Sequence, residues 1–337
     1  MDYQFFREKG YFKFPPILQI EITQKCPLSC PQCYKNLDEK EMPFDFLKDS
    51  IINASRNGTK HIVLNGGEPF VYSKIFDVLE IVDRLDVQVT LFTSGYGIHL
   101  EEVQALKVYQ NLHIGVSFNG SCEAIHSLSR DGFDISYSAA KLFAEQNLHY
   151  FINWVARHDN VMDFEDLILF AQKNKADFIN IVGNKLDGTG KIFQSLTRAD
   201  YEYLKKVIIN NRSICSIQNC YNTLQVFCYG ANKSHIIGCA AGITFCCINV
   251  DGSFMPCTHL YYPEKYSDLN QYWEKSKVLY MLRHRKTTGR CSTCINSPYC
   301  NFCKAMSEQS YRNFDIGLPN CCLLYTSPSP RDSTSSR

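Results

Sequence analysis

Apolar residues recur along the first two-thirds of the chain with two alternating periods. Short runs of apolar and β-branched residues predict strands, and longer segments with apolar residues three and four positions apart predict helices. The expected strands span residues 17–23, 61–64, 87–92, 113–118, 150–155 and 178–182. The expected helices span residues 44–57, 71–84, 101–109, 136–146, 164–174 and 198–210.

Six strands that are each followed by a helix predict a parallel sheet with right-handed connections. We therefore expect an α/β fold in which residues 17–210 form a partial (β/α)6 barrel of TIM type, after an N-terminal extension at residues 1–16. Beyond residue 210 the helical periodicity weakens and cysteines become frequent, so residues 211–322 predict a small domain built around metal. Residues 323–337 are rich in Ser, Pro and Thr and predict a disordered tail. Their composition resembles translated adapter or vector sequence more than a native terminus.

Charge and composition exclude several classes of partner. The formal net charge is +1 in 337 residues, which gives no electrostatic basis for binding nucleic acid or an anionic membrane. No apolar run approaches the roughly 20 residues of a membrane span, and the N-terminus has no secretory pattern. Seventeen cysteines with clustered spacings then favour metal ligation over disulfides. We expect a reducing, oxygen-poor cytoplasm.

Three cysteines follow the first expected strand, at Cys26, Cys30 and Cys33. Their Cys-x3-Cys-x2-Cys spacing has no fourth cysteine nearby to close a tetrahedral zinc site. Three thiolates can instead hold a [4Fe–4S] cluster whose fourth iron stays open to a further ligand. The alternatives are a zinc site completed by a distant ligand, or buried thiols without metal.

Polar and small residues also follow the other expected strands. In a parallel barrel, chemistry gathers in the loops after the carboxyl ends of the strands. The second strand leads into a turn whose two glycines let the backbone approach a ligand closely, although Gly-Gly alone is an ordinary turn. The candidates at these ends are Gly66, Gly67, Glu68, Ser94, Ser117 and Asn119, with Asn153, Arg157 and His158 as weaker ones. Ser94, Ser117 and Asn119 are small polar residues suited to a ribose.

A second group of cysteines lies near the C-terminus. Cys239 is followed by Gly252 and Cys257, and a Cys-x2-Cys-x5-Cys-x2-Cys run covers Cys291, Cys294, Cys300 and Cys303 before the pair Cys321 and Cys322. Taken alone, the run of four cysteines is equally consistent with a structural zinc site.

The first cysteine loop, followed directly by Tyr34, resembles the signature of the radical S-adenosylmethionine (radical SAM) enzymes. This resemblance implies that the open iron chelates SAM and that Gly66, Gly67 and Glu68 belong to the motif that holds its amino group. It also implies that Arg130 pairs with the SAM carboxylate, although Ser127 stands in that loop where relatives often have Asp.

The C-terminal cysteines resemble the SPASM extension of the peptide-modifying branch, which implies two auxiliary [4Fe–4S] clusters. One would use Cys239, Cys257 and Cys303, with Cys246 or Cys247 as the fourth ligand or an open site. The other would use Cys291, Cys294, Cys300 and one of Cys321 and Cys322, with Cys321 preferred. Two residues separate Cys300 from Cys303 where three are usual. The remaining cysteines, expected to be buried small hydrophobes, are Cys122, Cys215, Cys220 and Cys228.

The resemblance implies a maturase, an oxidoreductase that uses a 5′-deoxyadenosyl radical to modify a peptide or protein, such as a ribosomally made precursor. The product would be a thioether, a C–C crosslink or an oxidised side chain. The expected partners are that substrate and an electron donor such as flavodoxin or ferredoxin. An alternative enzyme is an anaerobic formylglycine-forming maturase of the sulfatase type. An alternative of another class is a zinc-stabilised binding module without catalysis.

Overall fold

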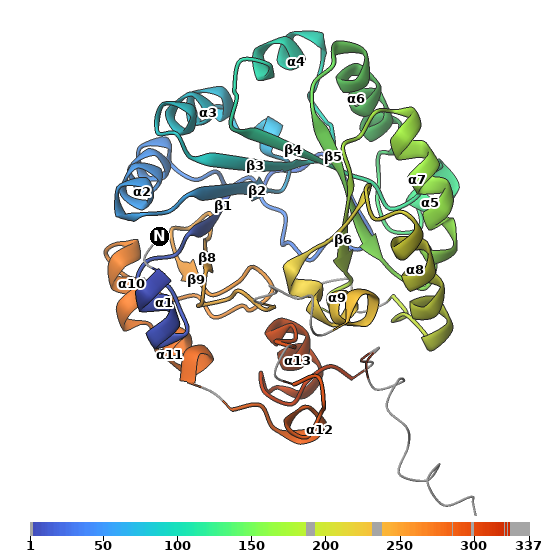
Figure 1. The fold of residues 1–337 in the computed structure, drawn as a ribbon. Helices are drawn as coiled ribbons and strands as arrows, with labels where there is room; N and C mark the ends of the chain where they lie inside the picture. The colour runs from blue at the N-terminus through green and yellow to red at the C-terminus, as the bar shows by residue number, and fades with distance from the viewer. Residues whose placement is uncertain are drawn as a thin grey trace, which may run out of the picture.

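A computed structural model describes residues 3–186, 193–230, 238–284, 286–297, 300–319, 321 and 323. One curved sheet organises these residues, with helices on its outer side and the C-terminal elements closing the lower part of the ring (Figure 1). No helix in the described part of the chain is long and apolar enough to cross a membrane.

The described residues contain one nine-stranded sheet with the order β7-β6-β5-β4-β3-β2-β1-β8-β9. Neighbouring strands are parallel from β7 through β8, and β9 is antiparallel to β8. The strands are β1 (Ile17–Thr23), β2 (His61–Gly66), β3 (Gln88–Thr93), β4 (Leu112–Ser117), β5 (Tyr150–Ala156), β6 (Ile179–Gly183), β7 (Cys215–Ile217), β8 (Phe245–Ile248) and β9 (Phe254–Met255). The expected α/β class and open parallel barrel are thereby confirmed.

Helices connect the parallel strands and cover the outside of the sheet. This layer consists of α2 (Phe44–Asn57), α3 (Ile75–Arg84), α4 (Leu100–Leu106), α6 (Phe133–Gln146), α7 (Phe164–Lys173) and α8 (Arg198–Asn210) (Figure 1). The remaining helices are α1 (Tyr3–Lys9), α5 (Glu123–His126), α9 (Asn222–Tyr229), α10 (Leu269–Lys275), α11 (Lys277–His284), α12 (Gly289–Ser292) and α13 (Lys304–Tyr311). Short 3-10 turns are η1 (Pro69–Val71), η2 (Val161–Asp163) and η4 (Asn219–Tyr221).

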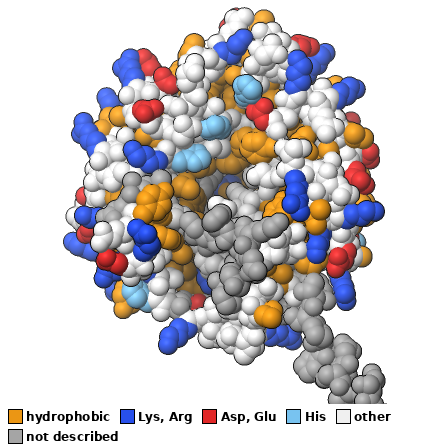
Figure 2. Space-filling view, in the orientation of Figure 1, with side chains coloured by type: hydrophobic (Ala, Val, Ile, Leu, Met, Phe, Trp, Pro, Cys, Tyr) orange, Lys and Arg blue, Asp and Glu red, His pale blue; other side chains and the backbone are white. Residues whose placement is uncertain are grey.

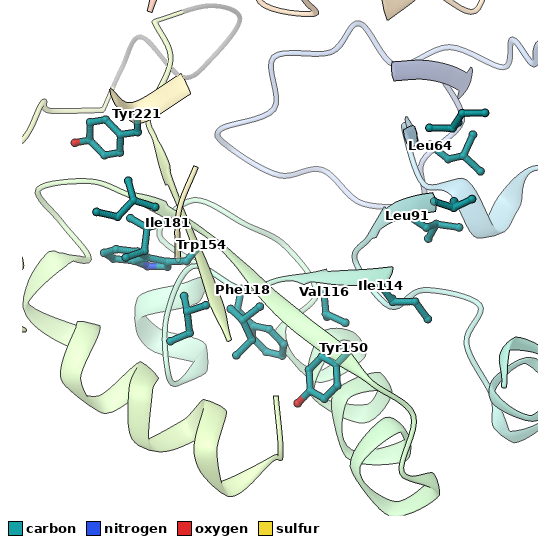
Figure 3. Packing of buried hydrophobic residues seen from close by; sticks show 14 of the residues in the cluster. Leu64, Leu91, Ile114, Val116, Phe118, Tyr150, Trp154, Ile181 and Tyr221 are labelled. Atoms are coloured by element: carbon teal, nitrogen blue, oxygen red, sulfur yellow. The ribbon is translucent and has the colours of Figure 1, made fainter. Parts of the chain in front are cut away.

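The main core lies between the sheet and this outer layer of helices. In α2 the buried residues Leu47, Ile51 and Ala54 recur every three or four positions, as an amphipathic helix requires. The strands supply the opposing side chains, and Figure 3 shows residues from β2 through β6 in this cluster, among them Leu91 and Trp154. Burial of this apolar surface leaves the inner side of the sheet available for polar side chains.

Residues beyond 210 extend the same sheet at both edges. Strand β7 pairs with β6, and β8 pairs with β1 so that Leu18 lies opposite Cys246 and Gln19 opposite Cys247. Trp273 in α10 is buried and donates its indole N–H to the carbonyl of Phe12 at 2.9 Å. The C-terminal region is therefore packed against the start of the barrel.

The structure differs from the expected strands and the helices that connect them in two main respects. The helix expected at residues 71–84 is divided into η1 and α3, because Pro69 begins a 3-10 turn that Glu68 caps through its side chain. The three strands after residue 210 are additional to the six expected, and each has only two to four residues.

Candidate active site

The carboxyl ends of β1 to β6 meet at one edge of the sheet, because all six strands are parallel. Figure 2 shows a hollow near the centre of one face of the molecule, bordered by hydrophobic side chains. The cysteine loop leaves the end of β1 at this edge, and the candidates that follow β2, β3, β4 and β5 start from the same edge.

The cysteine loop is folded back on itself and held by a second loop. Cys33 donates its backbone N–H to the carbonyl of Cys30 at 3.0 Å. The backbone N–H of Asp131 points to the sulfur of Cys30 at 3.5 Å, and the carboxylate of Asp131 accepts from Ser29 at 3.1 Å. The three thiols are half-buried and close enough for their charges to interact. Burial raises the pKa of Cys26 to about 11, so cluster assembly there must release a proton.

Gly66 and Gly67 let the turn after β2 pack directly on the start of the cysteine loop. Gly67 donates its N–H to Thr23 at 2.7 Å, and Glu68 donates to Lys25 at 2.8 Å. A Cβ atom on Gly66 or Gly67 would collide with the carbonyl oxygen of Thr23 or Lys25. The two glycines thus have a packing reason in addition to the cofactor contact that the sequence predicts.

Glu68 is a buried carboxylate whose oxygens are occupied by neighbouring donors. Its Oε1 accepts from the hydroxyl of Thr93 at 2.7 Å and from the N–H of Phe70 at 3.2 Å. Its Oε2 accepts from the N–H and the hydroxyl of Ser94. Burial raises the pKa of Glu68, while these hydrogen bonds lower it. Glu68 and Ser94 are thereby brought together, with the carboxylate tying the turn after β2 to the end of β3.

The candidate Arg130 and the residue Asn65, which was not among the candidates, each present a buried polar atom without a hydrogen-bond partner in the described residues. The Nε of Arg130 is one, and the charge of Arg130 lies near enough to Cys33 to lower the pKa of that thiol, against the larger effect of burial. The Oδ1 of Asn65 is the other, directly before the two glycines. The Nε–H of Arg130 could donate to a carboxylate of a ligand, and the Oδ1 of Asn65 could accept from an ammonium group.

A buried network anchors the cysteine loop to the ends of β4 and β5. Asn119 donates to Gln32 at 2.8 Å and to the hydroxyl of Ser129 at 2.7 Å. Arg157, fully buried, donates to Gln32 at 3.0 Å, to Ser129 and to Asp159 at 2.9 Å. The sequence does not predict the role of Gln32 and indicates that of Arg157 only weakly, because a single polar residue has no pattern. Ser117 is buried nearby, and its carbonyl accepts from Ser136.

The C-terminal cysteines gather in two places. Cys239 and Cys303 belong to a small buried cluster against which Cys257 packs. Cys291, Cys294, Cys300 and Cys321 line one pocket. Cys322 and the segment 187–192 lie outside the described residues, as does most of the tail expected at 323–337.

The structure separates Cys246 from the other proposed ligands. Cys246 lies in the main core with Leu18, and the side chain of Cys247 projects from the opposite side of β8, 3.8 Å from Gln19. The charge of Cys247 interacts with that of Cys257. Among the two cysteines considered for this site, Cys247 is therefore the one oriented toward Cys257.

The cysteine loop offers three half-buried thiols, and thiolates are the ligands of iron–sulfur clusters. No three His, Cys, Asp or Glu side chains of the described segments converge tightly enough to hold one metal ion. An iron–sulfur cluster is wider, and its thiolate ligands bind different irons at separate corners. Half-buried thiols at Cys26, Cys30 and Cys33, beside the unpartnered atoms of Asn65 and Arg130, fit a cluster with a zwitterionic ligand.

Known proteins agree with this geometry. Residues 20–171 match the Radical SAM superfamily. The fold is similar to that of SuiB from Streptococcus suis, solved with its precursor peptide SuiA, with a TM-score of 0.79 and 20% identity over 94% of this chain and 78% of that chain. A SuiB structure with S-adenosylmethionine superposes with a TM-score of 0.78 and 20% identity over 94% of this chain and 79% of that one.

A second similar fold is that of anSMEcpe with bound AdoMet and the Cp18Cys peptide. It has a TM-score of 0.71 and 18% identity over 92% of this chain and 94% of that chain. Radical SAM enzymes use a [4Fe–4S] cluster and SAM, which are the groups that the cysteine loop fits. Residues 20–171 therefore match the Radical SAM superfamily, and the chain has the fold of SuiB and anSMEcpe with a cysteine-rich C-terminal region.

Proposed function

We propose that this radical SAM enzyme modifies a peptide or protein substrate. The observation that carries the proposal is the cysteine loop at the carboxyl edge of the barrel together with a second set of cysteines packed against the same barrel. SuiB and anSMEcpe, whose folds are similar, have been solved with peptides. The division into residues 17–210 and 211–322 is part of the proposal.

In this proposal each group of residues has one task. Cys26, Cys30 and Cys33 hold the cluster that binds SAM, Asn65 accepts from the SAM ammonium, and Arg130 donates to its carboxylate. When bound, the cluster and SAM supply a radical that removes one hydrogen atom from the substrate. The ribose contact is assigned to Ser117. Asn119 is fully buried and its side chain is occupied by Gln32, Ser129 and Val155, so it holds the cysteine loop in place, as Glu68 and Ser94 hold their loops.

The C-terminal cysteines provide the site for the second electron. A substrate that has lost one hydrogen atom must lose a further electron and a proton to close a thioether or C–C bond or to form an oxidised side chain. Auxiliary clusters on the two C-terminal groups would accept that electron, and flavodoxin or ferredoxin would supply the one that starts each turnover. Cys291, Cys294, Cys300 and Cys321 line one pocket, and Cys257 packs against the buried cluster that contains Cys239 and Cys303.

The test is incubation of the anaerobically reconstituted enzyme with SAM, dithionite and a short peptide encoded beside its gene. We expect 5′-deoxyadenosine and a peptide that has lost two hydrogen atoms, located by tandem mass spectrometry. Reaction of the product with a hydrazide would instead indicate a formylglycine aldehyde and favour the sulfatase-type maturase. Stoichiometric zinc without sulfide, and no SAM cleavage, would refute the proposal in favour of a zinc module.

A further inference from the structure

A buried lysine lies among cysteines at the end of β6. Lys185 is 7% exposed, and its Nζ donates to the sulfur of Cys220 at 3.7 Å. Lys185 also forms a hydrogen bond with the sulfur of Cys303. An ammonium group buried beside neutral thiols is costly, whereas thiolates would neutralise its charge. The contacts of Lys185 therefore suit sulfurs that carry negative charge.

Cys220 is held at this position by the edge strand β7 and the turn that follows it. Cys220 lies in η4, which follows β7, and β7 pairs with β6 just before Lys185. The ring of Tyr221 packs on the backbone of Gly183, where an added Cβ would lie 3.2 Å from the ring. This contact fixes η4 against the end of β6.

Three further segments bring their cysteines to the same place. Cys239 and Cys303 belong to one small buried cluster, and Cys257 packs against it. Cys239 is fixed through its N–H to the carbonyl of Asn301 at 2.8 Å.

Helix α13 ties these segments together through one amide. The side chain of Gln309 accepts from the N–H of Leu186 at 3.0 Å and donates to the carbonyl of His259 at 3.1 Å. Leu186 follows Lys185 directly, and His259 lies two residues after Cys257. The lysine, the turn of Cys257 and the helix that begins after Cys303 are therefore held at fixed positions.

We propose that Cys220 is the fourth ligand of the auxiliary cluster held by Cys239, Cys257 and Cys303, and that Lys185 neutralises its thiolate. This inference rests on the proposed function. Cys220 was expected to be a buried hydrophobe, and it satisfies the requirement for which Cys246 or Cys247 was considered. Gln218, whose Oε1 lies 2.9 Å from the sulfur of Cys220, can turn its amide to donate to a thiolate.

The other two cysteines fit this role less well. Cys246 is enclosed in the apolar core. Cys247 interacts with Cys257, but the cation near it, Lys35, is already paired with Glu21 at 2.7 Å. Of Cys220, Cys246 and Cys247, Cys220 is the one whose sulfur contacts the buried ammonium of Lys185.

The test compares Cys220→Ala, Cys247→Ala and Cys228→Ala in the full chain, reconstituted anaerobically. Cys228 is a matched control, because it is a buried cysteine of the adjoining helix α9 whose sulfur interacts with Cys215. Iron and sulfide per chain and the electron paramagnetic resonance (EPR) spectrum of the reduced protein are measured. For Cys220→Ala we expect the iron to fall from about twelve toward about eight per chain, with loss or change of one cluster signal. The signal that SAM perturbs should remain.

Two further variants keep the inference testable if Cys220→Ala does not fold. Cys220→Ser retains the volume and offers an oxygen ligand, so one cluster signal should change while the iron content stays near wild type. Lys185→Met removes a positive charge beside one cluster, so the midpoint potential of that cluster should fall while the potentials of the other two clusters stay unchanged. Lys185→Arg keeps the charge and should give a potential close to that of the wild type.

An unchanged spectrum for Cys220→Ser would overturn the inference, as would iron loss in Cys247→Ala but not in Cys220→Ala. Failure of the proposed function has a different signature, since the wild-type chain would then contain no sulfide and would not cleave SAM. A third outcome is that the wild type contains three clusters and that neither Cys220→Ala nor Cys228→Ala lowers the iron and sulfide per chain. That outcome would refute the role of Cys220 and leave the proposed function standing.

Discussion

Gly317 shows how one residue without a side chain can make room for a ligand. Its φ of +111° suits glycine, and a Cβ there would collide with the sulfur of Cys291. Gly58 offers a matched control, because its φ is +114° and nothing lies within 4 Å of the position its Cβ would take. The two sites share the backbone strain and differ in the contact with a proposed ligand.

We therefore predict that Gly317→Ala loses iron while Gly58→Ala does not. Both substitutions should cost about 1 kcal/mol of stability through their positive φ. Displacement of Cys291 should in addition remove up to one cluster's iron from Gly317→Ala. Iron analysis beside thermal unfolding measures both effects, and equal iron contents in the two variants would contradict the proposed role of Cys291.

His126 makes the stability of the barrel depend on pH. It is fully buried, and burial together with the charge of Arg130 lowers its pKa to about 4. The ring is neutral in the folded protein, whereas in the unfolded chain it binds a proton near pH 6.5. Between about pH 6.5 and 4 the unfolded state binds more protons, so the free energy of unfolding falls as the pH falls.

This contribution should reach up to about 3 kcal/mol below pH 4, on the scale of 1.36 kcal/mol for each pKa unit. Urea titrations at several pH values should show a shallower pH dependence for His126→Gln than for the wild type. His284→Gln, at an exposed position, serves as the comparison and should retain the wild-type slope. A slope in His126→Gln as steep as in the wild type would exclude His126 as its source.

At the scale of elements, the cysteine loop depends on strands that lie far away in the sequence. Gln32 receives hydrogen bonds from Asn119 after β4 and from Arg157 after β5. Tyr34 contacts His259 with ring centroids 4.2 Å apart, which joins the loop to the turn of Cys257. The cysteine loop after β1 and the turn of Cys257 are therefore in direct side-chain contact.

Gln32→Leu should weaken the hold of this loop on its cluster. Two buried donors would lose their shared acceptor, at a cost of about 1–3 kcal/mol. We expect faster release of iron from the SAM-binding cluster to a chelator. Gln32→Glu keeps an acceptor for Asn119 and Arg157 and should release iron at close to the wild-type rate. Equal release rates for the Leu variant and the wild type would show that the network does not secure the loop.

At the scale of the whole molecule, the six strand–helix units were predictable because each strand is an apolar run and each helix has a regular buried face. Strands β7, β8 and β9 were not, because they have few residues and β8 consists of Phe, two Cys and Ile. The pairing of β8 with β1 joins residues more than two hundred positions apart, which no local pattern reports.

In the candidate site, too, some residues could be predicted from the sequence and others could not. Cysteine spacing identifies metal ligands from sequence, because the chemistry requires a fixed residue type at short intervals. Gln32 and Lys185 are single polar residues whose roles depend on burial and on partners from other strands. Spacing also could not choose between Cys246 and Cys247, which the alternation of β8 places on opposite sides of the sheet.

The central claim is that Cys26, Cys30 and Cys33 hold the cluster that cleaves SAM. The most direct measurement is 5′-deoxyadenosine formed by the reconstituted full chain with SAM and dithionite, in the wild type and in the triple variant Cys26→Ala, Cys30→Ala, Cys33→Ala. We predict that the wild type forms it, while the triple variant forms none and still contains about eight irons in the auxiliary clusters. Formation of 5′-deoxyadenosine by the triple variant at the wild-type rate would contradict the account.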